Sequence, residues 1–218
     1  MPYFQLLATA ALLACAATSY ATTPPAQTAD AAPAASTPGN EAGAQDADTV
    51  IHNIRGFMPD LRFSLTGAGN KTVTQKDFSG KVVMLFFGYA SCPDICPTTM
   101  AQLAQVIQNL GSDAARVRIV FVSVDPHRDT PEKLQKYVNA FSHNAVGLTG
   151  NERQIADVAR RYRVAYQIEK PKGKDADNYE VAHGRGVYIF DPAGHARLLA
   201  SDANSTSALT RDVRALLQ

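Results

Sequence analysis

The stretch that decides the fold is VVMLFFGYASCPDICPTTMAQL, residues 82–103, in which an apolar run leads directly into two cysteines and a predicted helix. The continuous apolar run over residues 82–87 is typical of a strand that is buried on both faces of a sheet. After the cysteines, apolar side chains recur at helical spacing: Met100, Leu103, Ile107 and Leu110. Cys92 and Cys96 are therefore expected at the junction of a core strand and a core helix.

The rest of the chain alternates strand and helix signals around this unit. A hairpin is predicted ahead of the core strand, from residues 61–67 and 70–81. The later predicted elements are a strand, two helices, two strands joined by a turn, and a last helix: residues 117–125, 130–142, 151–162, 186–191, 196–201, and from Ser205 or Ser207 to about Leu217. This order predicts an α/β thioredoxin-like fold, a central mixed sheet flanked by helices, with the N-terminal hairpin as an extension.

Composition and charge limit the class of protein. The chain has 218 residues, 45% hydrophobic and 19% charged, which suits one globular domain with an extension. Residues 1–50 contain four acids and no Lys or Arg, so the remainder carries 21 basic residues against 16 acids, the 20 of the chain less those four. The basic residues are interleaved with acids and form no aromatic-basic stripe. A nucleic-acid partner is therefore not expected.

The N-terminus predicts export. The apolar run over residues 6–17 suits the core of a secretory signal, although no basic residue precedes it. Two processing routes stay open, lipidation of Cys15 as in a bacterial lipoprotein or cleavage after Ala21, and an uncleaved anchor is a third. We expect a signal or anchor over residues 1–21, a disordered Ala/Pro/Thr-rich tether over 22–50, and the folded domain over 51–218. The domain would then be periplasmic and would meet the membrane only through its N-terminal anchor.

The spacing of the two cysteines allows three kinds of chemistry. At a helix N-terminus the thiol pKa is expected to fall from about 8.5 to roughly 3.5–7.5, which favours the thiolate. A separation of four residues places both sulfurs on one helix face, where they can converge on a soft metal ion. The same pair can cycle through a disulfide, with Cys92 attacking and Cys96 resolving. A purely structural disulfide is the weakest alternative, because so short a loop constrains the unfolded chain little.

A soft metal site needs further ligands, and imidazole is the natural third one. His183 directly precedes the predicted strand over residues 186–191, which in a thioredoxin-like fold runs next to the core strand ahead of the cysteines. The predicted ligand set is therefore Cys92, Cys96 and His183. The other histidines lie near the tether, near helix ends or in the predicted turn: His52, His127, His143 and His195.

Three segments together carry a family resemblance. FFGYASCPDICPTTM (86–100), VSVDPHRDTPEKL (122–134) and a histidine ahead of VYIFDPAG (187–194) resemble the Sco/SenC family of copper-binding proteins that help assemble cytochrome c oxidase. The similarity covers about residues 54–217. It implies that Cys92, Cys96 and His183 bind copper, as Cu(I) or Cu(II).

The same resemblance implies a function and the partners that it requires. The protein would deliver copper to the dinuclear copper site of oxidase subunit II, or reduce that site's cysteines so that they accept copper. Other periplasmic copper chaperones are further expected partners. A metallochaperone is the main prediction, and an enzyme, a thiol-disulfide oxidoreductase or a thiol peroxidase-like protein, is the alternative.

The chain departs from the family pattern beside the predicted histidine ligand. The family commonly has Asp-His-Ser there, whereas this chain has Ala182, His183 and Gly184. A carboxylate next to a ligating histidine can orient the ring or raise its basicity. Its loss predicts altered copper affinity or release, or a shift of emphasis toward thiol chemistry.

The segment DPHRDTPE, residues 125–132, allows two interpretations. Asp125 ends a predicted strand on the side of the sheet where α/β sites gather, and Arg128 and Asp129 are expected to form an ion pair that shapes the loop. The alternative is a turn followed by a helix cap, made by Thr130 and Pro131. Asp94, between the two cysteines, is expected to be a solvated loop acid.

Overall fold

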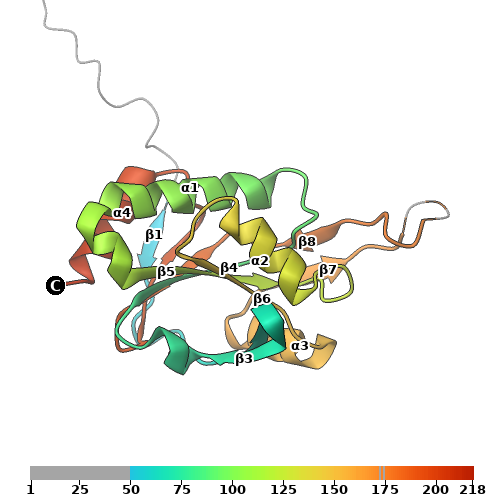
Figure 1. Cartoon of the computed structure of the whole chain (residues 1–218). Coiled ribbons are helices and arrows are strands. Elements are labelled where there is room, and N and C mark those ends of the chain that lie inside the picture. Colours follow the sequence, from blue (N-terminus) through green and yellow to red (C-terminus); the bar gives the residue numbers. More distant parts are fainter. Residues whose placement is uncertain (1–49, 172, 174) are drawn as a thin grey trace, which may run out of the picture. The chain divides into compact units, whose positions relative to one another are not determined.

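The computed structural model describes residues 50–171, 173 and 175–218, which fall in one compact unit (Figure 1). The predicted signal or anchor lies outside the described residues, and so does the predicted tether except for Val50. Within the described part of the chain, no helix is both long enough and apolar enough to cross a membrane.

A six-stranded mixed sheet forms the centre of the domain, as predicted, with the strand order β1-β10-β9-β4-β5-β6. The strands β4, β5 and β6 pair in parallel, whereas β9 pairs antiparallel with β4, β10 with β9, and β1 with β10. The bounds are β1 Ile51–Asn53, β4 Val82–Gly88, β5 Val117–Ser123, β6 Ala145–Leu148, β9 Val187–Phe190 and β10 Ala196–Ala200. The predicted core strand β4 is thus central, with neighbours on both sides.

In the part of the chain that the structure describes, four helices cover the sheet. They are α1 Ile95–Leu110, α2 Pro131–Asn139, α3 Glu152–Arg161 and α4 Thr206–Ala215, with short 3-10 helices at Ala68–Asn70, Gln75–Phe78 and Gly111–Arg116. Helices α1 and α4 lie side by side over one face, and α3 lies on the opposite face (Figure 1). The predicted starts are confirmed: Thr130 caps α2 ahead of Pro131, and Ser205 is the residue that precedes α4.

Strand β4 is buried on both sides because helices cover both faces of the sheet. Its side chains from Val82 to Phe87 are at most 1% exposed. Successive side chains of a strand point to opposite faces. Accordingly the Phe86 ring packs against Phe121, with centroids 5.9 Å apart, whereas Phe87 packs against Tyr162 at 6.2 Å. Phe86 thereby faces the side on which the cysteine helix lies.

The predicted N-terminal hairpin is confirmed as β2 (Ser64–Gly67) paired antiparallel with β3 (Lys71–Thr74). Four strands were not predicted: β1, β6, and a separate two-stranded sheet of β7 (Tyr166–Ile168) and β8 (Val181–His183). Each has only three or four residues, too few to display an alternating pattern, so tertiary pairing alone defines them. His183 therefore ends a strand instead of lying in a loop.

Gly88, the last residue of β4, permits the close approach of the cysteine helix. A Cβ at this position would lie 2.7 Å from Cys96 Sγ and 3.0 Å from Phe121 Cε2. Both neighbours are fully buried, so neither can move aside easily. A side chain at residue 88 is therefore incompatible with the packing of α1 on β4.

We expect Gly88→Ala to lower the free energy of unfolding by about 1–3 kcal/mol, as overpacking of a filled core does. Chemical denaturation of the metal-free protein measures this change. Gly184→Ala is the matched control, because its Cβ would meet nothing within 4 Å. Equal stability of the two variants would contradict the packing argument.

Candidate metal centre

Cys96 is placed by the junction of β4 and α1. It is the second residue of α1 and is fully buried. Its sulfur lies where the missing side chain of Gly88 leaves room. Helix packing therefore fixes this sulfur against the end of the core strand.

Cys92 lies in the loop that precedes α1, which we call the cysteine loop (residues 89–94). Its backbone N–H donates to the Tyr89 carbonyl at 3.2 Å, and its sulfur accepts the Cys96 backbone N–H at 3.5 Å. The residue is half-buried, so its sulfur is the more accessible of the two. Asp94 precedes the helix, but its exposed side chain makes no capping bond, which agrees with the predicted solvated acid.

His183, at the end of β8, brings its imidazole to the buried cysteine. Its Nε2 lies 3.3 Å from Cys96 Sγ, and its Nδ1 lies 2.9 Å from the Gly184 carbonyl oxygen. A carbonyl only accepts hydrogen bonds, so Nδ1 carries the proton and the Nε2 lone pair faces the sulfur. The rings of Phe86 and Tyr89 pack against the imidazole at 6.1 and 5.8 Å, both edge to face.

These three side chains form one cluster of potential metal ligands. Sγ of Cys92, Sγ of Cys96 and a nitrogen of His183 lie within 4.8 Å of one another, and both cysteines are free thiols. Sulfur and nitrogen ligands lie about 2.0–2.3 Å from a bound zinc ion, so two ligands of one ion are at most about 4.6 Å apart. The cluster is thus close to the geometry of a formed site and suits a soft ion.

No other such cluster of His, Cys, Asp and Glu occurs among the described residues. Of the other histidines, His127 pairs with Glu152 at 3.0 Å and His195 with Asp191 at 3.4 Å. The candidate centre therefore combines the three residues that the sequence predicted, from a loop, a helix and a strand.

The expected lowering of thiol pKa is wrong for Cys96. Burial raises the pKa of the Cys96 thiol above its ordinary value, and a hydrogen bond with the backbone of Tyr89 opposes this only in part. Burial likewise lowers the pKa of His183, which keeps the imidazole neutral. Desolvation of the charged form outweighs the helix terminus here. The metal-free centre therefore holds a protonated Cys96 thiol facing a neutral imidazole.

The loop after β5, residues 125–129, reaches both sides of the centre, and we call it the DPHRD loop. The predicted Arg128–Asp129 ion pair is wrong: Arg128 Nε pairs with Asp125 Oδ2 at 2.5 Å, and Asp129 Oδ1 lies 3.3 Å from Lys133 Nζ. Asp129 Oδ2 instead accepts hydrogen bonds from the Ala90 backbone at 2.9 Å and the Ser123 hydroxyl at 2.7 Å. Asp129 thus ties the cysteine loop to the end of β5.

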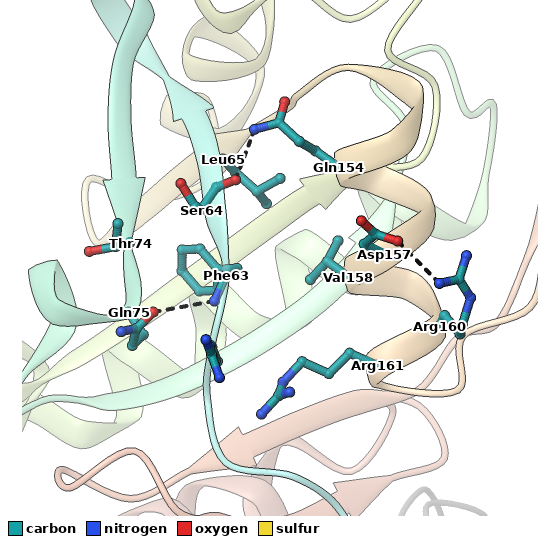
Figure 2. A pocket seen from close by; sticks show the side chains of 11 residues that line it. Phe63, Ser64, Leu65, Thr74, Gln75, Gln154, Asp157, Val158, Arg160 and Arg161 are labelled. Atoms are coloured by element: carbon teal, nitrogen blue, oxygen red, sulfur yellow. Dashed lines mark hydrogen bonds and ion pairs between the residues drawn. The ribbon is translucent and has the colours of Figure 1, made fainter.

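The centre opens on a cavity of about 370 Å³ between the cysteine loop and β8, lined by Cys92, His183, Glu169, Glu180, Arg185 and others. A larger cavity of about 710 Å³ lies elsewhere, between the β2–β3 hairpin and α3 (Figure 2). Its lining includes Arg62, Arg160 and Arg161 and contains neither a thiol nor an imidazole. Soft-metal chemistry therefore belongs to the smaller cavity.

Comparison with known families identifies the chain. The SCO1/SenC family model matches residues 56–218. The chain belongs to the SCO1/SenC family. The thioredoxin-like fold predicted from the sequence is the fold of its Sco structural neighbours.

Individual relatives agree with this assignment. The bovine (Bos taurus) protein SCO2 homolog, mitochondrial, is 39% identical over 154 residues, which cover 70% of this chain and 57% of the relative. The chain spans about half the length of the first curated relatives it matches. Among solved structures, copper-bound ScoI of Bradyrhizobium japonicum is 34% identical with a TM-score of 0.62, covering 71% of this chain and 98% of that one. Apo Sco1 of Thermus thermophilus is 33% identical with a TM-score of 0.67, covering 78% and 99%.

Sequence reasoning missed the residues that support the centre. Gly184, whose carbonyl accepts from the imidazole, and Tyr179, which contacts the DPHRD loop, were not assigned these roles. The Gly184 bond is made by backbone and so leaves no trace in residue type. This bond also bears on the missing carboxylate at Ala182. The Gly184 carbonyl orients the imidazole ring, and the side chain of residue 182 is exposed.

We expect His183 to be the Nδ1-protonated tautomer in the metal-free protein, with a pKa below the ordinary value of about 6.5. The carbonyl of Gly184 enforces the tautomer, and burial lowers the pKa. Nitrogen chemical shifts from NMR, recorded as a function of pH, measure both. An Nε2-protonated ring at neutral pH would contradict the assigned orientation.

Proposed function

We propose that this protein binds copper through Cys92, Cys96 and His183 and delivers it to the dinuclear copper site of cytochrome c oxidase subunit II. The observation that carries the proposal is the cluster of two thiol sulfurs and one imidazole nitrogen within 4.8 Å. Thiolate ligands select Cu(I) and zinc over hard ions. Structural zinc sites use four protein ligands, whereas this cluster has three. Family membership and the copper-bound structure of Bradyrhizobium japonicum ScoI favour copper.

The state of each ligand suits loading and release. The imidazole already presents its Nε2 lone pair, because the Gly184 carbonyl holds the proton on Nδ1 and burial lowers the pKa of the ring. The Cys96 thiol is protonated without metal, so copper binding must displace its proton. The half-buried Cys92 sulfur is the ligand that an incoming thiolate can replace first. Copper then passes by exchange of ligands, without a change in its oxidation state.

We expect His183→Ala to weaken Cu(I) binding by the reduced protein at least about 100-fold, since even loss of an outer-shell partner typically costs 10- to 100-fold. Competition with a chromophoric Cu(I) chelator under anaerobic conditions measures the affinity. His143→Ala is the matched control, because His143 is exposed and belongs to no ligand cluster. Parent-like affinity of His183→Ala would show that the ligand assignment is wrong.

A second candidate function is reduction of the cysteines of the subunit II site. Cys92 is half-buried whereas Cys96 is fully buried, so the Cys92 sulfur is the one that a target disulfide can reach, and it would attack as the thiolate. That attack would form a mixed disulfide. Cys96 would then release the target as a dithiol, leaving a Cys92–Cys96 disulfide. The two electrons come from the Cys92–Cys96 pair.

We expect His183→Ala to keep this thiol chemistry while it loses copper, because only the two sulfurs change oxidation state. The measurements are the reduction potential of the Cys92–Cys96 pair and the release of thiols from an oxidised subunit II peptide. Cys96→Ser should stop at the mixed disulfide. Copper transfer to the peptide without any thiol release would rule against the reductase function.

We also propose that the domain is exported and held at the membrane by its N-terminal segment, with other copper chaperones supplying the metal. The proposal rests on the apolar run over residues 6–17 and the Ala/Pro/Thr-rich stretch over 22–50. Mass spectrometry of the mature N-terminus separates a lipidated Cys15 from a chain cut after Ala21. An unprocessed chain in the cytoplasm would contradict export.

A further inference from the structure

The strand that carries His183 is not paired with the central sheet. Among the described residues, strand β8 pairs only with β7, with Tyr166 opposite His183, Gln167 opposite Ala182 and Ile168 opposite Val181. The pair extends away from the central sheet (Figure 1). An isolated two-stranded hairpin is marginally stable in water. Other contacts must therefore fix where the imidazole lies.

Arg128 makes those contacts on the segment that connects β7 to β8, just ahead of β8. Its Nη1 donates to the carbonyl oxygens of Asp177 and Tyr179, at 2.8 and 2.9 Å. Its Nε pairs with Asp125, whose side chain is fully buried, and the Arg128 side chain is itself only 10% exposed. One guanidinium thus joins the end of β5 to the backbone of residues 177–179, just ahead of β8.

Tyr179 is held twice by the same pair of residues. The guanidinium carbon of Arg128 lies 3.6 Å from the centre of the Tyr179 ring, and the Tyr179 hydroxyl donates to Asp125 Oδ1 at 2.8 Å. Tyr179 is four residues before His183, so fixing its ring and its carbonyl restricts the path of the chain into the centre. Stacking and a planar fork of donors are properties of arginine that lysine lacks.

Arg128 also reaches the other wall of the imidazole site. Its guanidinium carbon lies 5.5 Å from the centre of the Tyr89 ring, and Tyr89 packs edge to face on His183. Arg128 therefore contacts both the chain that leads to His183 and the ring against which the imidazole rests, without being a ligand itself.

We propose that Arg128, held by Asp125 and stacked on Tyr179, is a positioning residue that sets the distance of the His183 imidazole from the two thiols and thereby the affinity for copper. The inference rests on the proposed function. It assigns to the DPHRD loop a role beyond a turn and a helix cap: the loop positions the third ligand through Arg128, as it positions the cysteine loop through Asp129.

The test is a double-mutant cycle on Cu(I) affinity, measured with the chelator competition described above. Arg128→Lys keeps a positive charge beside the buried Asp125 and loses the fork and the stacking. We expect it to weaken Cu(I) binding about tenfold, as loss of an outer-shell partner does, through faster release to the chelator. In the His183→Ala background the same change should have no further effect, because the residue acts only through the imidazole.

Arg160→Lys is the matched control. Arg160 pairs with Asp157 at the same three-residue separation and at 3.1 Å, but both side chains are exposed and lie on α3, away from the centre. Its copper affinity and release rate should equal those of the parent. If Arg128→Lys does not fold, Tyr179→Leu removes the stacked ring and the hydroxyl while leaving the Arg128–Asp125 pair, and the same coupling to His183 is expected.

The outcomes distinguish failure of the proposed ligand set from failure of the positioning role of Arg128. If His183→Ala binds copper as tightly as the parent, the proposed ligand set fails. If His183→Ala is weak but Arg128→Lys, or Tyr179→Leu in its place, binds like the parent, the positioning role alone is overturned. Equal losses with and without His183 would overturn it as well, because Arg128 would then act on the thiols or on general stability.

Discussion

The contact between the Cys96 sulfur and the His183 imidazole joins parts of the chain that are 87 residues apart. It depends on the pairing of β9 with β4, in which Val187 lies opposite Phe86. That register brings the residues ahead of β9 to the end of β4, where α1 begins. Gly88 then allows the sulfur to approach the strand, so the centre exists only because this part of the sheet is packed without a side chain at that position.

Burial is what gives the centre its chemical character. Desolvation raises the pKa of Cys96 and lowers that of His183, so both are neutral before metal arrives. A neutral pair is cheaper to bury than a separated thiolate and imidazolium. In the proposed copper-bound form, the charge of the ion compensates the thiolates and so changes this balance. The proposed copper site therefore becomes a thiolate site only when the metal binds.

Two buried carboxylates of the DPHRD loop organise the surroundings. Asp125 and Asp129 are at most 1% exposed, and a buried charge requires partners. Asp125 has Arg128 and the Tyr179 hydroxyl, whereas Asp129 has the Ala90 backbone, Ser123 and Lys133. Each acid therefore holds a different segment of the chain in place. Asp125 holds the segment that leads to His183, and Asp129 holds the cysteine loop.

The sequence by itself determined the central strand, the helices and the identity of the three potential ligands. Long apolar runs and helix caps are local signals, and thiol and imidazole are recognisable by residue type. Only the tertiary structure decided the short strands, the partner of Arg128, the orientation of the imidazole and the protonation of Cys96. These depend on pairing between distant segments, on a backbone carbonyl at Gly184 and on desolvation. A backbone carbonyl leaves no trace in residue type, and strand pairing and burial depend on segments that are far apart in the chain.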